Sequence, residues 1–415
     1  MQRKFFPGWA VVAAAFAVLF LAYGVQFSYG IFIPGMAADL AWSRADTALP
    51  FSIYVFVYSA LSAVTGQATD RFGPRRVISA GAVLLGLGWG LSALVTQPWH
   101  LNITLGLVAA LGMSVVWVPC NATVARWFTR RRGTAVAIAS TGASLGNFIV
   151  PVLAAVAVQH WGWRVTLAAL AVGSALGILF AARAMVREPE ALGLWPDGDI
   201  LRPPQSELTG GQTVRELWWT ESFMLIIGIY FFTWLVIFVP FVHGPAYAQD
   251  LGLSRALGAS ILSAIGIGGI VGRLTSGVIS DALGRCPTLL LVCALQAVGF
   301  ALFALAQGAV GLCSAALVFG FSYGGSVSLL PALCGDLFGR AHVASVVGAI
   351  FAIAGSPAAV GPYVAGWLYD TTGSYGSAFW LAALLNVLAC LLTGVLVWRA
   401  RVRAAAEVLK IGDCA

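Results

Sequence analysis

The strongest constraint on this chain is a succession of long apolar segments, each near the length of a membrane-spanning helix. About 20 apolar residues, rising 1.5 Å each, cross the ~30 Å of hydrocarbon in a bilayer. The chain therefore predicts an all-α polytopic membrane protein with twelve transmembrane helices. The twelve segments are 8–33, 46–68, 77–95, 101–124, 134–157, 165–185, 222–247, 255–279, 288–306, 310–334, 343–368 and 376–398.

Composition excludes the main alternatives to a helical membrane protein. Of 415 residues, 60% are hydrophobic and 9% are charged, whereas soluble domains carry roughly 25% charged residues. A transmembrane β-barrel would alternate polar and apolar residues, which these segments do not. The first segment is too long for a signal peptide and lacks a small-residue cleavage site. The 48 glycines fit close helix packing in lipid.

The basic residues predict the orientation of the chain. If both termini are cytoplasmic, most of the 23 lysines and arginines fall in cytoplasmic segments, while Arg44, Arg164 and Arg255 fall in outer loops. The positive-inside rule therefore places both ends in the cytoplasm, for a protein of the plasma (inner) membrane. The net charge of +7 is thus explained by the orientation of the chain in a lipid membrane, and no nucleic-acid partner is expected.

The chain divides into two halves that share a repeated loop. Pro, Gly and charged residues mark 186–221 as a cytoplasmic linker between helical bundles at 1–185 and 222–398, with a tail at 399–415. Segment 66–76 reads GQATDRFGPRR, and segment 277–285 reads GVISDALGR. Such duplication is typical of transporter folds. A short polar loop with topogenic charge is the alternative. The gating residues predicted from this motif are Asp70, Arg71, Gly73, Arg75, Asp281, Gly284 and Arg285.

Loop 66–76 resembles the signature loop of the major facilitator superfamily, whose fold is two six-helix bundles that rock around a central site. A narrower resemblance lies in 126–137, RWFTRRRGTAVA, which is similar to the loop and fifth-helix motif of the monocarboxylate transporters. Segment 7–12, PGWAVV, looks like the end of their first-helix motif, without its acidic start. Segment 187–198, REPEALGLWPDG, resembles bacterial members and the related oxalate–formate exchangers. The resemblance implies a transporter, not an enzyme.

Arg273 is the most informative residue of the predicted spans. It lies eight residues before Asp281, so roughly 12 Å above the cytoplasmic end of its helix. An arginine near the midplane costs at least ~2.5–3.5 kcal/mol, and all sixteen acidic residues sit in loops or near span ends. A substrate carboxylate is the simplest counter-ion, because a guanidinium binds it with two parallel hydrogen bonds. The alternative is that Arg273 satisfies carbonyls at a kink near Gly268 and Gly269.

The resemblance agrees, since monocarboxylate transporters and oxalate exchangers place a substrate-binding arginine at this position of helix eight. Three departures matter. The animal transporters have an acidic residue where this chain has Gly269, and a lysine where it has Phe27. The second basic residue of oxalate exchangers is absent from helix eleven, around 353–357. One fixed cation favours a substrate with one carboxylate, because a dianion would leave charge unpaired in low dielectric.

Aromatic and polar residues at similar depth complete the predicted substrate site. Hydroxyl and amide groups suit a 2-hydroxy or 2-keto oxygen, and aromatic faces suit a short alkyl tail. Tyr23 also matches a pocket tyrosine of the family. For each residue alone, packing is an equally good explanation. The candidates besides Arg273 are Tyr23, Phe27, Trp117, Asn121, Ser144, Asn147 and Tyr323.

Coupling to protons is the expected driving force for this monocarboxylate anion. Moving a monoanion inward against a negative interior costs ~2.3 kcal/mol per 100 mV. The helix-eight acid of the family is absent, so the proton-binding candidates are His243 and Asp250, seven residues apart at the outer end of span seven. Histidine changes charge near neutral pH. The alternative is an ordinary span end and a loop carboxylate.

Other functions fit the sequence less well. An anion exchanger of the oxalate–formate type is the second transporter candidate. A membrane substrate sensor usually adds a large cytoplasmic domain, and a channel does not need duplicated gating loops. No HxxxH, HExxH or paired-carboxylate motif indicates an enzyme. The seven cysteines include no CxxC and none in an outer loop, so we expect neither disulfide, metal nor cofactor.

Overall fold

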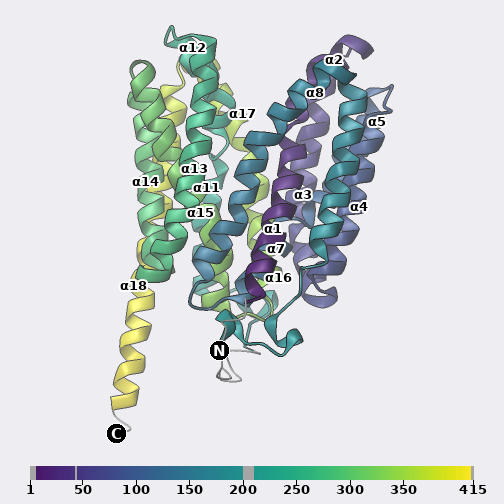
Figure 1. Ribbon diagram of the computed structural model, residues 1–415. Helices are drawn as coiled ribbons and strands as arrows, with labels where there is room; N and C mark the ends of the chain where they lie inside the picture. The colour runs from purple at the N-terminus through teal and green to yellow at the C-terminus, as the bar shows by residue number, and fades with distance from the viewer. Residues whose placement is uncertain (1–5, 43, 200–209, 413–415) are drawn as a thin grey trace. The chain divides into compact units, whose positions relative to one another are not determined.

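A computed structural model describes residues 6–42, 44–199 and 210–412. These residues are almost entirely helical, and their one β-type pairing is an isolated bridge from Gly211 to Gly339. Figure 1 shows the course of the chain. The helices of its first half are α1 (Gly8–Phe27), α2 (Tyr29–Leu40), α3 (Arg44–Phe72), α4 (Pro74–Ser92), α5 (Pro98–Ile103), η1 (Thr104–Ala109), α6 (Ala110–Ser114), α7 (Trp117–Trp127), α8 (Arg132–Ala182), η2 (Pro189–Leu192) and η3 (Pro196–Gly198). Those of its second half are α10 (Val214–Leu217), α11 (Glu221–Leu235), α12 (Val239–Asp250), α13 (Arg255–Leu283), α14 (Arg285–Leu305), α15 (Gly308–Phe338), α16 (Val343–Gly355), η4 (Ser356–Ala359), α17 (Val360–Thr372) and α18 (Gly376–Gly412).

All twelve predicted segments are helical. Among the described residues, ten helical stretches are long and apolar enough to cross a membrane. One of them, α8, contains two predicted segments, 134–157 and 165–185, and α4 contains most of the segment 77–95. The predicted all-α membrane protein is therefore confirmed.

A single glycine divides α8 (Figure 1). Gly162 has φ 72° and ψ 167°, which are not helical values, so the helix is broken at this residue. A positive φ is strained for residues with a Cβ, and glycine adopts it without that penalty. The sequence around this glycine is polar and aromatic, with His160, Trp161 and Trp163. The break is therefore the loop predicted between two spans.

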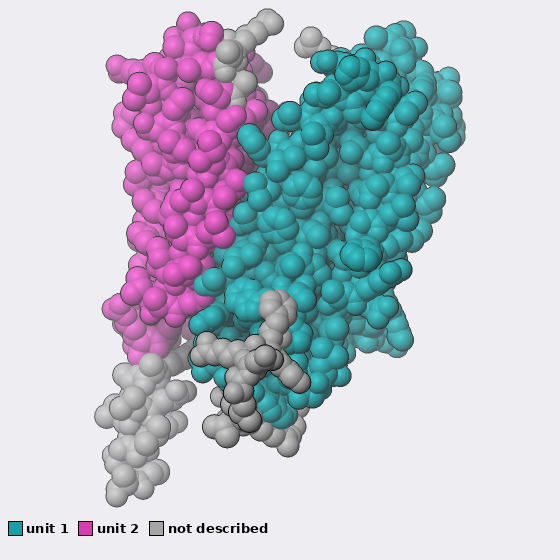
Figure 2. Space-filling view, in the orientation of Figure 1, with its two compact units in different colours: residues 1–214, 328–359 teal, residues 215–327, 360–415 magenta. Residues whose placement is uncertain are grey.

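The chain forms two compact units (Figure 2). Unit 1 contains residues 1–214 and 328–359, and unit 2 contains residues 215–327 and 360–415. Residues 328–338 of α15, all of α16 and η4 therefore cluster with the N-terminal helices. The bundles expected at 1–185 and 222–398 follow chain order, and that division remains a prediction.

The surface and interior of these helices suit a lipid environment. Many large apolar side chains are exposed, with Phe180, Leu176 and Val310 among them. Small polar side chains inside are satisfied locally: Ser28 donates to the Gly24 carbonyl, and Thr233 donates to the Ile229 carbonyl. Lipid offers no hydrogen bonds, so polar groups must be paired within the protein. The chain is a multi-pass membrane protein.

Candidate functional site

Arg273 lies in the middle of α13, where this helix packs closely against α15 within unit 2. A Cβ added at Gly272 would overlap the carbonyl oxygen of Phe321, and one at Gly324 would overlap that of Gly269. Only glycine permits this approach of two helix backbones, a form of packing common in membranes. The contact sets the distance from Arg273 to side chains of α15.

The guanidinium of Arg273 lies over an aromatic side chain of α15. Its Cζ atom is 5.6 Å from the centroid of the Tyr323 ring, a distance at which a cation is attracted to the ring face. The Tyr323 ring stacks on Phe319 and meets Phe241 of α12 edge-on, with centroids 6.2 Å and 5.5 Å away. Arg273 is 3% exposed. The structure thus brings together two predicted site residues, Arg273 and Tyr323.

The glycines before Arg273 do not accompany a break in the helix. α13 is continuous from Arg255 to Leu283, and a Cβ at Gly268 would overlap the Leu317 carbonyl oxygen of α15. Gly268 therefore serves helix packing. Gly269 differs, because a Cβ there would lie 3.6 Å from the Gly320 carbonyl oxygen and 3.9 Å from Tyr323 Cδ1. Those are ordinary contacts, so a Cβ at position 269 would fit beside Tyr323.

Four predicted residues of unit 1 form one aromatic and polar group. Tyr23 stacks on Phe27 with centroids 6.2 Å apart, and it meets the Trp117 ring edge-on at 6.0 Å. Asn121 donates from Nδ2 to the Trp117 carbonyl at 2.9 Å. Trp117 Nε1 and Asn121 Oδ1 are buried and have no hydrogen-bond partner among the described residues. The group therefore offers one donor and one acceptor, and unmet polar atoms of this kind are costly unless something binds them.

Ser144 and Asn147 are the remaining candidates of unit 1. Both are half-buried on α8, the helix that packs along α1 through Gly142 and Gly146. The predicted substrate-binding residues thus fall into two sets. Six lie in unit 1, and two, Arg273 and Tyr323, lie in unit 2.

The signature loop of unit 1 is tied into a buried ionic network. Asp70, at the end of α3, pairs with Arg126 of α7 and accepts a 2.8 Å hydrogen bond from the Ser345 amide of α16. Arg126 also donates to the carbonyls of Arg340 and Ala341, at 3.0 and 2.9 Å. The carboxylate thereby joins three helices. Gly73, with φ 84°, forms the turn into α4, while Arg71 and Arg75 are exposed.

Arg340 extends this network to the linker. Its guanidinium donates to the Glu190 carboxylate at 3.0 Å and to the Arg126 carbonyl at 2.6 Å. The Asp197 carboxylate accepts from the backbone amides of Thr129 and Arg130, both at 2.8 Å. The carboxylates of Glu190 and Asp197 therefore hold this segment against the loops that follow α7 and α15, within unit 1.

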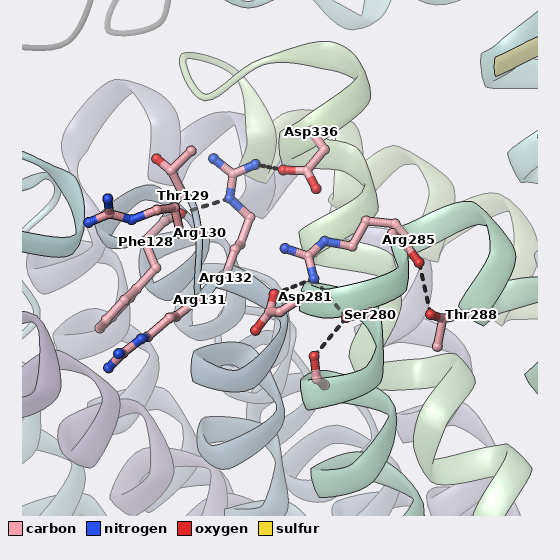
Figure 3. A network of polar contacts seen from close by, with 12 residues as sticks. Phe128, Thr129, Arg130, Arg131, Arg132, Ser280, Asp281, Arg285, Thr288 and Asp336 are labelled. Atoms are coloured by element: carbon pink, nitrogen blue, oxygen red, sulfur yellow. Dashed lines mark hydrogen bonds and ion pairs between the residues drawn. The ribbon is translucent and has the colours of Figure 1, made fainter. Parts of the chain in front are cut away.

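Arg132, the first residue of α8, forms a further ion pair of unit 1. It pairs with Asp336 of α15, and its Nε donates to the carbonyls of Ala125 and Phe128, each at 2.9 Å (Figure 3). From the sequence, Arg126 and Arg132 belong to the motif segment 126–137 and Arg340 is one of the basic residues that predict the topology, and none of the three has a predicted partner. Their distance in sequence from their carboxylates left no local signal for the pairing.

The signature loop of unit 2 has a local arrangement instead. Arg285 pairs with Asp281 four residues earlier and donates to the Ser280 hydroxyl at 2.7 Å (Figure 3). Gly284, with φ 94°, joins α13 to α14 as Gly73 joins α3 to α4. The two repeats therefore share their backbone turn and differ in the partner of the aspartate.

His243 and Asp250 of α12 meet at a tyrosine pair. His243 Nδ1 lies 3.2 Å from the Tyr375 hydroxyl, and its Nε2 lies 2.9 Å from the Pro362 carbonyl oxygen. Tyr375 stacks on Tyr369 of α17, with centroids 4.3 Å apart, and Tyr369 interacts with the Asp250 carboxylate. Sequence spacing placed His243 and Asp250 on one face of a helix but could not find the tyrosines, which follow more than 110 residues later.

The cysteines and acidic residues build no metal site within the described part of the chain. Across those residues, no group of three or more His, Cys, Asp or Glu side chains lies close enough to hold an ion. Cys120, Cys293 and Cys334 are buried as free thiols, where small apolar side chains would also fit. Cys414 lies outside the described residues.

Comparison with known proteins adds family and fold. The Major Facilitator Superfamily profile matches residues 15–362. The chain is 32% identical over 390 residues to monocarboxylate transporter 11 of Mus musculus, covering 90% of this chain and 83% of the relative. It is 29% identical over 381 residues to monocarboxylate transporter 13 of Bos taurus, covering 90% and 86%.

Solved structures share the fold at low sequence identity. The proton:xylose symporter XylE, bound to 6-bromo-6-deoxy-D-glucose, superposes with a TM-score of 0.75 at 17% identity, covering 92% of this chain and 94% of that one. The transporter FucP in its outward conformation superposes with a TM-score of 0.74 at 15% identity, covering 94% and 99%. At these identities the likeness establishes the fold alone.

Proposed function

Because the chain belongs to the major facilitator superfamily and, within it, is related to the monocarboxylate transporters, we propose that it carries small monocarboxylates such as lactate and pyruvate. Transport proceeds by alternating access, coupled to proton symport, in the plasma (inner) membrane with both termini cytoplasmic. The family establishes that the chain is a membrane transporter and not an enzyme, and the substrate, the proton coupling and the orientation are proposed.

The observation that carries the substrate class is the buried guanidinium of Arg273 beside Tyr323. A guanidinium keeps its charge under all physiological conditions and presents a planar fork that matches a carboxylate. Tyr323, packed against Phe319 and Phe241, gives the guanidinium an apolar neighbour, and a charge-assisted hydrogen bond is stronger where the local dielectric is low. A short organic acid, with one carboxylate and a small tail, suits these surroundings.

The aromatic and polar group of unit 1 offers further hydrogen bonds to a substrate. The indole N–H of Trp117 is a donor, and Asn121 Oδ1 is an acceptor. A 2-keto oxygen accepts from the first, and a 2-hydroxyl group donates to the second. The group of unit 1 thus suits a 2-keto or 2-hydroxy acid by itself, and Tyr23 and Phe27 offer aromatic faces to an alkyl tail. Ser144 and Asn147 are proposed as more distant contributors from α8.

Proton coupling is proposed at the outer end of α12. His243 is half-buried and Asp250 is exposed, so protons can reach both from the outer side. Substrate binding at Arg273 and protonation of His243 or Asp250 together permit closure of the outer gate. The gating role itself is assigned to both signature loops, through Asp70, Arg71, Gly73 and Arg75 in unit 1 and Asp281, Gly284 and Arg285 in unit 2.

Uptake into proteoliposomes tests the proposal. Labelled lactate, pyruvate, formate and oxalate are offered under an imposed inward pH gradient. We expect lactate and pyruvate to enter faster than oxalate, and Arg273→Ala to lose at least about 100-fold of the uptake, the scale of two charge-assisted hydrogen bonds. Oxalate-for-formate exchange without pH dependence would instead support the exchanger, and wild-type uptake by Arg273→Ala would exclude this arginine.

Arg399→Ala is the matched control for that experiment. Arg399 lies on α18 and pairs with Glu221 at 3.0 Å, with both side chains near half exposed. Exposed ion pairs contribute little to stability, so the control variant should keep wild-type uptake. Thermal unfolding of both variants separates loss of binding from loss of fold.

A further inference from the structure

The linker between the two predicted bundles contacts two loops that are far apart in the sequence. The first loop, 128–131, joins α7 to α8 in the N-terminal half of the chain, and the second, 339–342, joins α15 to α16 in the C-terminal half. Both loops belong to unit 1, as do the described linker residues 186–199 and 210–214. Within one compact unit, the linker thus connects segments that chain order assigns to different bundles.

One set of linker contacts is made entirely with the N-terminal half. The Asp197 carboxylate accepts hydrogen bonds of 2.8 Å from the backbone amides of Thr129 and Arg130, in the first loop. The Val186 carbonyl accepts from Trp127 Nε1, also at 2.8 Å. We call these contacts the N-terminal anchor. Since both sides of the anchor come from the same half of the chain, a movement of the other half need not break it.

A second set of linker contacts holds the loop of the C-terminal half. The Glu190 carboxylate accepts from both terminal nitrogens of Arg340, at 3.0 and 3.4 Å. The Gly210 carbonyl accepts from the Arg340 amide at 3.1 Å, and the Gln212 amide donates to the Phe338 carbonyl at 3.0 Å. We call these contacts the latch. The latch combines one ion pair with backbone hydrogen bonds to the same loop.

Arg340 connects the latch to Asp70, one of the proposed gating residues. Its Nη2 donates to the Arg126 carbonyl at 2.6 Å, and its own carbonyl accepts from Arg126 Nε at 3.0 Å. Arg126 pairs with Asp70, and Asp70 accepts from the amide of Ser345 at 2.8 Å, in the first turn of α16. A displacement of Arg340 therefore disturbs the contact between Asp70 and α16.

The ion pair of the latch is shielded from water. The side chains of Arg340 and Glu190 are 8% and 24% exposed, whereas those of Arg130 and Asp199, another pair made by the linker, are 70% and 41% exposed. An exposed pair contributes little to stability, but a buried guanidinium that loses its carboxylate is costly. Docking of the second loop should therefore depend on Glu190 far more than on Asp199.

We propose that Glu190 latches the loop 339–342 to the N-terminal half of the chain, and that each transport cycle opens the latch while the N-terminal anchor stays closed. The inference rests on the alternating access of the proposed function. That motion moves the two halves of a transporter against each other, so contacts between this loop and the N-terminal half cannot persist through the cycle. Glu190 is a positioning residue, because it acts on Asp70 through Arg340 and Arg126.

Hydrogen–deuterium exchange of the full chain in lipid nanodiscs, read at single residues by mass spectrometry, tests the latch without any substrate. Glu190→Gln keeps the shape of the side chain and removes its charge. We expect exchange at the amides of Arg340, Gln212 and Ser345 to rise about tenfold, which corresponds to about 1.4 kcal/mol. The amides of Thr129 and Arg130 should stay as protected as in the wild type.

That difference between the two ends of the linker separates a latch from a merely structural contact. A linker that unfolds as a whole would raise exchange at Thr129 and Arg130 as much as at Arg340. Such an equal rise overturns the proposal, and so does unchanged exchange at Arg340 and Ser345 in Glu190→Gln.

Two substitutions on the same linker serve as comparisons. Asp197→Asn weakens the anchor, so exchange should rise at Thr129 and Arg130 and stay unchanged at Arg340. A rise at Arg340 of the same size would show that anchor and latch open together, which contradicts the proposal. Asp199→Asn is the matched control, because its pair is exposed; it should change neither group of amides.

Gly211→Ala opens the latch without changing any charge, and it keeps the test decisive if Glu190→Gln folds poorly. A Cβ at Gly211 would lie 2.9 Å from both the amide nitrogen and the Cβ of Ala341, so the backbone part of the latch must move. We expect the same pattern as in Glu190→Gln, with faster exchange at Arg340 and Ser345 and none at Thr129. Protection of Arg340 equal to that of the wild type would contradict the latch.

Substrate keeps this inference separate from the proposed function. A wild-type protein that transports no monocarboxylate contradicts the proposed substrate, whatever the exchange pattern of the variants. In a wild type that does transport lactate, turnover should raise exchange at Arg340, Gln212 and Ser345 together and leave Thr129 protected. If lactate is transported and exchange at those three amides does not change, the latch does not open during transport and the inference alone is wrong.

Discussion

Arg126 and Arg273 are buried to nearly the same degree, 2% and 3% exposed, in very different surroundings. Arg126 lies in the last turn of α7, beside the Asp70 carboxylate and two backbone carbonyls. Arg273 lies in the middle of α13, over the ring of Tyr323. The first arginine forms a structural ion pair, and we propose that the second binds the substrate carboxylate. Burial alone does not tell the two roles apart; the neighbouring groups do.

The two signature loops repeat this contrast on a smaller scale. Asp70 connects α3 to α7 and α16 through Arg126 and Ser345, whereas Asp281 pairs with Arg285 one turn away. The same motif therefore holds several helices together in unit 1 and closes a single turn in unit 2. Substitutions at matched positions should have unequal effects.

The largest expected effect is that of Asp70→Asn. The substitution keeps the shape of the side chain but leaves the buried Arg126 charge without its carboxylate, which costs about 3–5 kcal/mol. Reversible unfolding of the purified protein in mixed micelles measures the loss. A change below about 1 kcal/mol would show that the two carbonyl acceptors of Arg126 suffice.

Asp281→Asn is the matched substitution in unit 2. Its partner Arg285 keeps the Ser280 hydroxyl as an acceptor and lies one turn away. We expect a smaller loss than that of Asp70→Asn, about 1–3 kcal/mol, because Arg285 retains a hydrogen-bond acceptor. If the two aspartates prove equally important, the contrast between a multi-helix and a local contact is wrong.

Gly269→Asp should give Arg273 a carboxylate neighbour, as Asp70 is for Arg126. The new Cβ has room beside Tyr323, and the side chain begins one turn before Arg273, where it can form an i, i+4 ion pair. The internal carboxylate would compete with a substrate carboxylate, so we expect at least a tenfold loss of affinity, about 1.4 kcal/mol. Radiolabelled lactate binding measures it.

Gly269→Asn is the control for the size of that side chain. It has the volume of aspartate without the charge, and it should lose clearly less affinity. Equal losses in the two variants would show that steric filling, not competition for Arg273, reduces binding.

The smallest expected effects come from the ring beside Arg273. Tyr323→Phe keeps the aromatic face and should change lactate affinity less than about twofold. Tyr323→Leu removes the face and should weaken binding about fivefold, since a cation over a ring contributes about 1 kcal/mol. A Tyr323→Phe variant as weak as Tyr323→Leu would assign the effect to the hydroxyl instead.

Much of the fold could be predicted because membrane spans are encoded locally. Each apolar segment has the length of a span, and Gly162 and its polar neighbours mark the turn inside α8. Arg273 stood out for a related reason, since a charge in an apolar segment is conspicuous. Its neighbour Tyr323, among other aromatic residues at similar depth, could be proposed but not distinguished.

The partners of these residues were not predictable, because they depend on long-range packing. Asp70 and Ser345 are 275 positions apart, and His243 and Tyr375 are 132 apart. In the sequence, Arg126 and Arg340 resemble the arginines that set the topology. Only the folded structure shows that they form buried ion pairs. The turn before α18 is short and polar, so nothing local marks Tyr375 as a contact of α12.

Binding of lactate and of its neutral analogue lactamide, compared in the wild-type protein and in Arg273→Ala, is the most direct test of the role of Arg273. The two ligands have nearly the same shape and differ in charge. We expect the wild type to prefer lactate by at least about 100-fold, about 2.7 kcal/mol, and Arg273→Ala to lose that preference. An Arg273→Ala variant that still prefers lactate to the same extent would show that another group binds the carboxylate.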